Sequence, residues 1–325
     1  MALLRSAAAP EARVDGPGNP GGPDHVDCAV IVVTYNNADD IAALLASLPA
    51  ATEGLSVRTV VVDNHSSDRT VEVVRSAGGA MCVEAGANLG YAGAINIGRA
   101  HVGPCSSILI LNADLVLEPG AVSALFAVLS EHGVGVAVPR LLDEHGSLYP
   151  SLRREPTLMG ALGDALCGAH FPRRPGWASE MVRRPSRYDR GHRVHWATGA
   201  AMLIAADCDA AVGPWDEDRF FLYSEETDFA ARARAAGWTV DYVPAARATH
   251  RQGGSGQSPD LAALMAVNRV RYYEKRHGRA PSAAFRSMAV LHELLRCADP
   301  VHRRALRFLL RRSSWARLPG GRGAT

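Results

Sequence analysis

Short apolar runs rich in β-branched residues alternate with segments of helical period through the first part of this chain. The strand-like runs are residues 28–33, 59–62, 81–83, 107–111 and 134–138. Such alternation is typical of a parallel sheet with helices on both faces, because each parallel strand needs a crossover connection. The sequence therefore predicts an α/β fold, with a doubly wound and mostly parallel sheet flanked by helices.

Polar side chains gather where three of these strands end. The segments are Thr34 to Asn36, Asp63 to Ser66 and Asn112 to Asp114. Ligands of such sheets bind beyond the carboxyl ends of the strands. Asx and Ser residues also favour turns for local reasons, so each segment alone is a weak signal. Three of them at one edge predict a ligand site.

Three acids, Glu225, Glu226 and Asp228, crowd the start of a predicted helix behind the aromatic run Phe220–Tyr223. Ser224 in front of them is a suitable N-cap, and acids in a first turn favour the helix dipole by roughly 0.3–1 kcal/mol each. A purely structural role is therefore one interpretation. A site that handles protons or cations is the other, and the rest of the chain favours it.

Length and composition divide the chain into regions. The 325 residues, 47% of them apolar, suffice for a large α/β domain with additions. Residues 1–25 are rich in Ala, Pro and Gly without periodicity, and we expect a disordered tail there. The main domain is expected over residues 26–275, with an irregular insertion at 151–195 that holds nine arginines against four acids. A basic helical extension is expected over residues 276–325.

Several other classes of protein are disfavoured. The six cysteines include no C-x-x-C pair and no secretory segment opens the chain, so we expect a reduced, cytoplasmic protein. No run approaches the roughly 18 apolar residues of a membrane span. No G-x-G-x-x-G follows the first strand, which disfavours a dehydrogenase. Residues 32–37 also lack the Gly-rich basic loop expected of a nucleotidyltransferase. Separately, we expect no nucleic-acid partner.

Several motifs follow one another within residues 28–275. They are Val30–Asn36, Val61–Asp68, Asn88–Asn96, Leu111–Asp114 and Glu225–Asp228. As an ordered set they resemble the family 2 inverting glycosyltransferases of the GT-A fold, and most closely the rhamnosyltransferase-like branch that builds bacterial polysaccharides. The resemblance implies a GT-A fold, a nucleotide-sugar donor and a role in polysaccharide or cell-wall synthesis.

The resemblance also assigns roles to single residues. Nucleotide-sugar-binding residues are expected at Thr34, Tyr35, Asn36, Asp63, Asn88, Gly90, Asn96, Asn112 and Ala113. Asp63 is expected to accept a hydrogen bond from a uracil or thymine base, and a strand-end turn residue is the alternative. Apart from the resemblance, acceptor-binding residues are expected at Thr198 and Gly199, because glycine permits close approach to the backbone, and at Trp196, through stacking on a sugar face. Ordinary packing is the alternative for the tryptophan.

The resemblance implies a divalent metal ion, Mg²⁺ or Mn²⁺. Asp114 is the first candidate ligand, and His250 in a later loop is the second, with a solvent-facing histidine as the alternative. Asn112 stands where the family usually has the first acid of a D-x-D motif, so one expected ligand is neutral.

Glu226 is the proposed general base, at a position where aspartate is more common, and Glu225 and Asp228 are its neighbouring candidates. A single base without a carboxylate nucleophile fits direct displacement with inversion. The predicted function is an inverting, metal-dependent glycosyltransferase, with L-rhamnose from dTDP-rhamnose as the leading donor and a glycan or lipid-linked acceptor. The alternatives are another UDP, GDP or dTDP sugar, or a catalytically silent module that binds nucleotide sugars.

The C-terminal region is basic, with twelve Lys and Arg against two acids from Lys275 onward. Leu306, Leu309 and Leu310 share one face of a predicted helix, with arginines largely opposite. Such a helix can lie on an anionic membrane surface, here the inner face of the cell membrane. A packed terminal helix with a solvated arginine face is the equal alternative.

Overall fold

The computed structural model describes residues 13–15, 24–168, 174–251 and 258–319. Its strands are β1 (Arg13–Asp15), β2 (Val26–Thr34), β3 (Val57–Asp63), β4 (Ala80–Glu84), β5 (Cys105–Asn112), β6 (Leu115–Leu117), β7 (Val134–Leu142), β8 (Leu152–Arg153), β9 (His192–Val194), β10 (Trp196–Ala197), β11 (Ala201–Ala205) and β12 (Thr239–His250). Its α-helices are α1 (Ile41–Ala51), α2 (Thr70–Ala77), α3 (Gly90–His101), α4 (Ala121–Leu129), α5 (Leu158–Cys167), α6 (Ala206–Val212), α7 (Glu225–Ala235), α8 (Pro259–Arg276), α9 (Arg279–Leu294) and α10 (Pro300–Leu310). Its 3₁₀ helices are η1 (Gly176–Ala178), η2 (Pro185–Arg187) and η3 (Arg312–Arg317).

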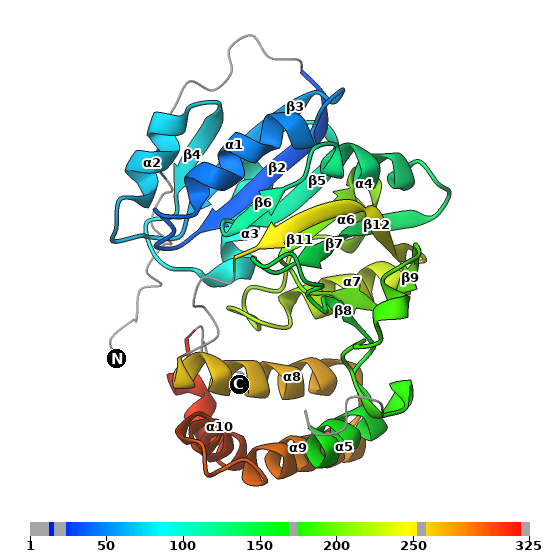
Figure 1. Cartoon of the computed structure of the whole chain (residues 1–325). Coiled ribbons are helices and arrows are strands. Elements are labelled where there is room, and N and C mark those ends of the chain that lie inside the picture. The colour runs from blue at the N-terminus through cyan, green and yellow to red at the C-terminus, as the bar shows by residue number, and fades with distance from the viewer. Residues whose placement is uncertain (1–12, 16–23, 169–173, 252–257, 320–325) are drawn as a thin grey trace.

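One large sheet organises the described part of the chain (Figure 1). Its strands follow the order β1-β4-β3-β2-β5-β11-β7-β12-β6, and β9 pairs with β12. The strands β2, β3, β4 and β5 are parallel, as are β7 and β12, whereas β11 runs antiparallel between β5 and β7. The predicted doubly wound, mostly parallel sheet is confirmed.

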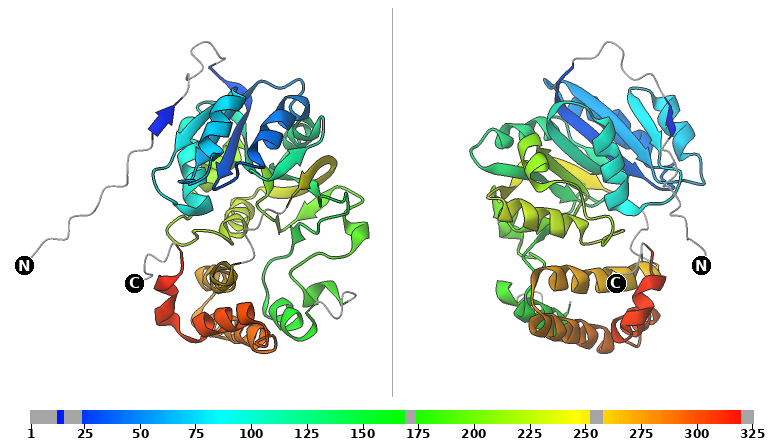
Figure 2. Two further views of the ribbon diagram at one scale, coloured as in Figure 1. Left: turned by 60° about the vertical axis from the view of Figure 1, so that its left-hand side comes forward. Right: turned by 180° about the vertical axis from the view of Figure 1, so that it is seen from behind.

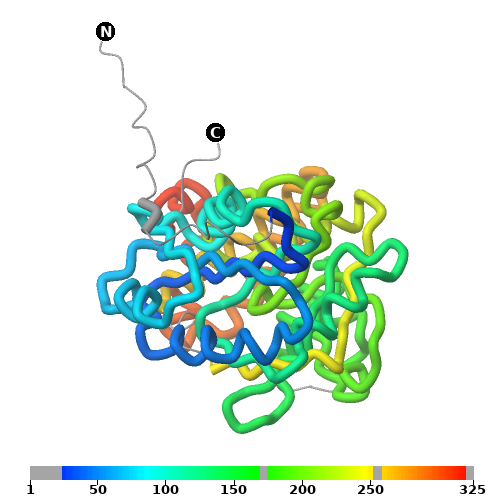
Figure 3. Tube along the Cα trace, turned by 90° about the horizontal axis from the view of Figure 1, so that it is seen from above, coloured from blue at the N-terminus to red at the C-terminus, as the bar shows by residue number. Residues whose placement is uncertain are grey.

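Helices cover both faces of this sheet because its central strands are apolar on both sides. Residues 28–34 of β2 are all buried. Side chains of α1 and α4 belong to the apolar cluster on one face, and those of α3 and α7 to the cluster on the other. Seen from above, the blue and light-blue segments with α1 and α2 lie at the left, and the green-to-yellow segments around β9 and β12 lie at the right (Figure 3).

A helical layer made of α5, α8, α9 and α10 lies below the sheet (Figures 1 and 2). Its apolar interior includes Ala161 of α5, Val267 of α8, Phe285 of α9 and Leu309 of α10. The layer thus joins a helix from the middle of the chain to the three C-terminal helices. Because α8 ends at Arg276, the expected division between residues 275 and 276 falls at a helix end, and it stays a prediction.

Three expectations differ from the structure. Arg13–Asp15 pairs with β4 as an antiparallel strand, so the expected disordered tail contains regular structure there, and residues 1–12 and 16–23 lie outside the described residues. Residues 151–195 contain the regular helix α5, which begins after Thr157, whose side chain accepts a hydrogen bond from the Gly160 amide. His250 is the last residue of β12 and is not in a loop.

The basic helix α10 is packed against α8 and α9. Ala305, Phe308 and Leu309 are buried in the helical layer, whereas Leu310 is 59% exposed. Of the two alternatives for this helix, the structure shows the packed terminal helix. Within the described ranges, no helix has both the length and the apolar character needed to cross a membrane.

Candidate active site

A cavity of about 750 Å³ lies between the sheet and the helical layer. The predicted site residues that line it are Asn112, Asp114, Trp196, Thr198, Gly199, Glu225, Glu226 and His250. Residues predicted for the base, the metal and the acceptor therefore come together from four separate segments. The other predicted nucleotide residues do not line this cavity, and most of them lie at or near the ends of β2, β3 and β5.

Hydrogen bonds tie the ends of β2 and β3 together. Asp63, only 2% exposed, accepts hydrogen bonds from the Thr34 hydroxyl (3.1 Å) and from the amide (2.9 Å) and hydroxyl (2.5 Å) of Ser66. The amide of Asn36, whose backbone is left-handed at φ 55°, donates to the Ser66 hydroxyl at 2.9 Å. Tyr35 beside it is 51% exposed. Asp63 thus makes the contacts of a strand-end turn residue, and its role toward the nucleotide base stays a prediction.

The Asn88–Asn96 segment fixes α3 against the turn that precedes α7. Gly90 has φ +77°, and a Cβ there would lie 2.1 Å from the carbonyl oxygen of Phe221, so glycine is required. The side-chain oxygen of Asn88 accepts the Gly90 amide at 3.0 Å. Asn96 exchanges hydrogen bonds with the backbone of Trp215 at 2.9 and 3.0 Å. The side chains of Asn88 and Asn96 thus make structural contacts, and nucleotide binding by this segment stays a prediction.

Asp114 and His250, predicted as metal ligands on distant segments, meet in the structure. His250 Nε2 lies 3.1 Å from Asp114 Oδ1, and His250 Nδ1 is buried with no hydrogen-bond partner among the described residues. The imidazole also meets the ring of Tyr149 edge-on at 5.6 Å. Neighbouring ligands at about 2.1 Å from an octahedral ion lie about 3 Å apart, which matches the spacing of this pair.

The turn before α7 has an unusual backbone. Tyr223 (φ 69°) and Ser224 (φ 73°) are both left-handed, a conformation that costs non-glycine residues of order 1–3 kcal/mol each. Asn268 of α8 holds the turn by donating to the carbonyl oxygens of Leu222 (2.9 Å) and Tyr223 (3.2 Å). Ser224 occupies the N-cap position without a side-chain cap, so the predicted capping role is wrong.

This turn places two carboxylates in the cavity. Glu225 is 4% exposed and Glu226 is half-buried, and Oε2 of each is buried without a hydrogen-bond partner in the part of the chain that the structure describes. Burial raises the pKa of Glu225 well above its ordinary value, and the Glu226 carboxylate adds to the rise. Burial also raises the pKa of Glu226, opposed by Arg153 and by the Gly199 amide. Burial is thus the largest cause of the raised pKa of both glutamates.

Asp228 does not line the cavity. Its carboxylate, 1% exposed, pairs with Arg232 at 2.8 Å and with the only lysine of the chain, Lys275, at 2.7 Å. A candidate base must reach the acceptor hydroxyl. The structure therefore places Asp228 in a buried ion cluster that joins α7 to α8, and not in the predicted catalytic group.

The predicted acceptor residues lie beside Glu226. A Cβ on Gly199 would be 3.6 Å from Glu226 Cβ, so the glycine backbone packs directly against the proposed base. The Thr198 hydroxyl is buried and has no hydrogen-bond partner among residues with described positions. Trp196 is 7% exposed, donates its indole N–H to a backbone carbonyl at 2.9 Å and carries the Arg153 guanidinium over its ring at 5.9 Å. These contacts favour the packing alternative for the tryptophan.

Sequence reasoning missed Tyr91 and Arg153, which also line the cavity. The Tyr91 hydroxyl donates to the Gly199 carbonyl at 3.0 Å, and burial followed by the nearby carboxylates raises its pKa well above the ordinary value. Its position inside the Asn88–Asn96 motif was the available signal. Arg153 was hidden because nearly all basic residues of the chain are arginines.

Comparisons with known proteins show which proteins the sequence of this chain resembles. A model of glycosyl transferase family 2 matches residues 29–178. The N-acetylglucosaminyl-diphospho-decaprenol L-rhamnosyltransferase of Mycobacterium tuberculosis is 33% identical over 244 residues, which cover 71% of this chain and 78% of that protein. The low-salt glycan biosynthesis hexosyltransferase Agl10 of Haloferax volcanii is 28% identical over 230 residues, 70% of this chain and 67% of that protein.

Solved structures share the architecture. The mannosyltransferase PcManGT from Pyrobaculum calidifontis, in complex with GDP-Man and Mn²⁺, superposes with a TM-score of 0.53 at 19% identity, covering 91% of this chain and 77% of that one. GalNAc-T7 with UDP, GalNAc and Mn²⁺ superposes with a TM-score of 0.53 at 15% identity, covering 82% of this chain and 54% of that one. At these identities the likeness shows the fold alone, and it is the expected GT-A fold. The family model and the 33% identical relative show that the chain belongs to glycosyl transferase family 2 and is a glycosyltransferase.

Proposed function

We propose that this glycosyltransferase moves L-rhamnose from dTDP-rhamnose, with inversion at the anomeric carbon, to a hydroxyl of a lipid-linked glycan. The observation that carries the proposal is the single cavity in which Glu226 lies together with Asp114 and His250. The choice of sugar and acceptor is supported by the 33% identical relative, which is named an N-acetylglucosaminyl-diphospho-decaprenol L-rhamnosyltransferase.

Glu226 acts as the general base. It takes the proton of the acceptor hydroxyl while that oxygen attacks the anomeric carbon, on the face opposite the bond to the leaving diphosphate. The raised pKa of Glu226 makes the carboxylate a stronger base. Glu225, whose pKa burial raises further above the ordinary value, retains a proton more readily, so the pair carries less negative charge than two carboxylates would.

The residues at the sheet edge fit a divalent metal ion. Asp114 and His250 would hold it, since their donor atoms have the spacing of neighbouring ligands and their chemistry suits Mn²⁺ better than Mg²⁺. When bound, such an ion neutralises the charge that develops on the leaving diphosphate. Two solved structures of this fold are Mn²⁺ complexes, which supports the assignment.

A lipid-linked acceptor requires contact with a membrane, and we place this contact at the cytoplasmic face of the cell membrane. Among the described residues, seven of the eight exposed large apolar side chains lie in or beside the helical layer, namely Met159, Leu166, Trp177, Met265, Leu294, Leu295 and Leu310. Arg303, Arg304 and Arg307 of α10 are exposed as well. The contact is thus assigned to exposed side chains of the whole helical layer, because Ala305, Phe308 and Leu309 of α10 are buried within it. The six free cysteines suit a reducing compartment.

A donor panel tests the choice of nucleotide. Thermal stability is measured with UDP, GDP and dTDP sugars in the presence of Mn²⁺, since a ligand that binds only the folded state stabilises it with the logarithm of its concentration over Kd. We expect dTDP-rhamnose to give the largest shift. A larger shift with a UDP or GDP sugar would replace the donor, and no shift with any of them would remove the proposal.

A further inference from the structure

The cavity has two ends of opposite charge. Asp114, Glu225 and Glu226 line the end at the sheet edge, where Arg153 is the one arginine set against the three acids among the described lining residues. The end at the helical layer, called here the arginine end, is lined by Arg174, Arg183, Arg269, Arg296 and His292. A concave surface lined by charges of one sign attracts ligands of the opposite sign, so the two ends of the cavity favour different ligands.

Two of the four arginines are neutralised by carboxylates. Arg174 pairs with Asp164 of α5, and Arg269 of α8 pairs with Glu180 at 2.6 Å. These two arginines therefore have a structural role, because each forms an ion pair that links two segments of the chain. The ion pairs do not explain the guanidinium groups of Arg183 and Arg296.

Arg183 and Arg296 have no carboxylate partner among the described residues. Arg183 is exposed, and its side chain has no hydrogen bond or ion pair with another described residue. Arg296 donates to the backbone carbonyl oxygens of Asp164 (3.2 Å), Ala165 (3.0 Å) and His292 (2.9 Å), so neutral acceptors hold it in place at the end of α5. The arginine end therefore keeps an excess of positive charge, with one guanidinium fixed in position and one free to adapt.

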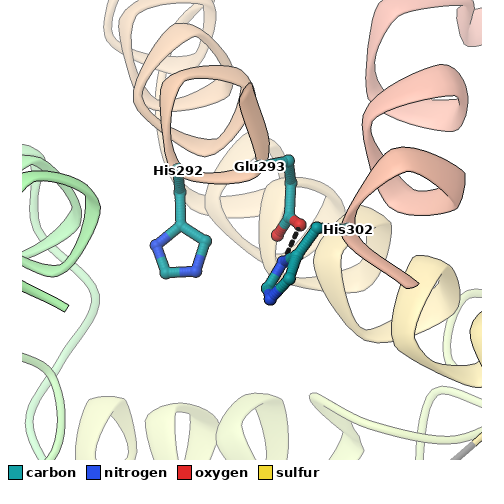
Figure 4. Close-up of side chains that lie close together, drawn as sticks. All are labelled: His292, Glu293 and His302. Atoms are coloured by element: carbon teal, nitrogen blue, oxygen red, sulfur yellow. Dashed lines mark hydrogen bonds and ion pairs between the residues drawn. The ribbon is translucent and has the colours of Figure 1, made fainter. Parts of the chain in front are cut away.

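His292 adds an unused polar atom to this end. Figure 4 shows that Glu293 faces His302, whose Nδ1 lies 2.6 Å from the Glu293 carboxylate, while the His292 ring stands apart. Nδ1 of His292 is buried and has no hydrogen-bond partner in the described ranges. Burial, followed by the charges of Arg296 and Arg269, lowers the pKa of His292 to about 4, so the ring is neutral and keeps one N–H.

The three residues in Figure 4 also have the composition of a metal site, and their ligand atoms lie within 4.8 Å of one another. The surroundings oppose this use. Glu293 is already engaged by His302, and the positive charges next to His292 repel a cation. An anion meets attraction from the same groups.

We propose that the arginine end binds a phosphate or diphosphate group that links the acceptor sugar to its carrier. The inference rests on the proposed function and names the acceptor class of the same site. A diphosphate placed against Arg296 and Arg183 leaves the attached sugar in the part of the cavity that leads to Glu226. The diphosphate of the donor belongs at the opposite end, with Asp114 and His250, so the second anion site serves the second substrate.

Three acceptors that carry the same sugar test the proposal on the full-length chain. One has a long-chain lipid diphosphate, one a short-chain alkyl diphosphate and one a neutral short-chain alkyl glycoside. For wild type, kcat/KM should be at least tenfold higher with either diphosphate than with the neutral glycoside. A preference for the long-chain acceptor alone would show that the lipid chain and not the phosphate is recognised, which would overturn the proposal.

Arg183→Gln and Arg296→Gln should each lower the ratio of kcat/KM for the short-chain diphosphate to that for the neutral glycoside, by about tenfold for one lost charge-assisted contact. Arg193→Gln is the matched control, because Arg193 is exposed on β9 and does not line the cavity, and it should keep the wild-type ratio. Since Arg296 also supports α5, Arg183→Gln is the decisive variant if Arg296→Gln proves unstable. Wild-type ratios in the Arg183 variant would contradict the proposal. Release of no nucleoside diphosphate with any acceptor or with water would instead contradict the proposed function itself.

Discussion

At the scale of single residues, the three acids at the start of α7 divide into two roles. Glu225 and Glu226 line the cavity, and Asp228 lies in an ion cluster with Lys275. Successive residues of a helix differ by about 100° in direction, so residues 226 and 228 point to nearly opposite sides. The predicted helix start after Ser224 agrees with the structure. The sequence therefore contained this signal, but which side of the helix faces the cavity depends on packing against distant segments.

Glu226→Gln and Asp228→Asn should therefore fail in different ways. The first should lower kcat by roughly 10²–10⁴-fold while donor binding is kept, because an amide cannot accept the proton. The second should lower the free energy of unfolding by about 1–3 kcal/mol, since Arg232 and Lys275 lose a buried partner but keep some access to water. Steady-state kinetics and denaturant unfolding check the pair. Near wild-type turnover of Glu226→Gln would remove the base assignment.

Glu225 makes the stability of the protein depend on pH. Burial raises its folded-state pKa above the ordinary 4.5, so the folded protein binds this proton more tightly than the unfolded chain does. The contribution of this group to folding stability is fully present below pH 4.5, and it is lost as the pH rises through the raised pKa. The Glu225→Gln variant has no carboxyl group to ionise, so it does not lose stability in this way. The difference between its Tm and that of wild type should therefore grow in favour of the variant as the pH rises from 4.5. A difference that is constant with pH would contradict the raised pKa.

At the scale of elements, strands and their ends were predictable and the turns between distant elements were not. The runs at 28–33, 59–62, 81–83, 107–111 and 134–138 all lie within strands. They were found because buried strands of a parallel sheet are apolar throughout. The turn at Tyr223 and Ser224 depends on Asn268, far along the chain, and no local pattern indicates such a contact.

Asn268→Leu tests the support of that turn. Loss of both hydrogen bonds leaves two carbonyl groups unsatisfied and should cost about 1–3 kcal/mol of stability. The start of α7 should also shift, which would lower kcat more than donor affinity. Adding Ser224→Gly should restore part of both losses, since glycine adopts positive φ without strain. Full activity in Asn268→Leu would mean that the turn is held by other contacts.

The packed state of α10 predicts a contrast between two of its apolar residues. Phe308 is 5% exposed, so Phe308→Ala should cost about 3–5 kcal/mol through the cavity that it leaves. Leu310 is 59% exposed, and Leu310→Ala should change stability by no more than about 0.5 kcal/mol. Thermal or denaturant unfolding compares the two. Equal, small effects would mean that α10 is not packed in solution.

At the scale of the whole molecule, the sheet edge could be predicted and the opposite wall of the cavity could not. The resemblance in ordered motifs indicated Asp114, His250 and Glu226 because each lies in or near a recognisable segment. The arginine end is assembled from the segment after α5, from α8 and from the end of α9, and only packing of the helical layer brings these together. In a chain with so many arginines, no spacing distinguishes these from the rest.

Metal dependence belongs to this scale, because the two proposed ligands, Asp114 and His250, lie far apart in the sequence and meet only in the folded chain. Asp114→Asn and His250→Ala should each raise the Mn²⁺ concentration needed for half-maximal activity by tenfold or more, and excess EDTA should abolish transfer. Titration of activity with Mn²⁺ after chelation measures both. Full activity in excess EDTA would contradict the metal assignment.

The most direct test of the account is the stereochemical outcome of one reaction. Full-length protein is incubated with dTDP-rhamnose, Mn²⁺ and a lipid diphosphate acceptor, and the anomeric configuration of the new bond is read by NMR. We expect a rhamnosyl product with the configuration opposite to that of the donor, formed at least about 10²-fold more slowly by Glu226→Gln. A product that retains the donor configuration, or transfer by the variant at near wild-type rate, would contradict direct displacement assisted by Glu226.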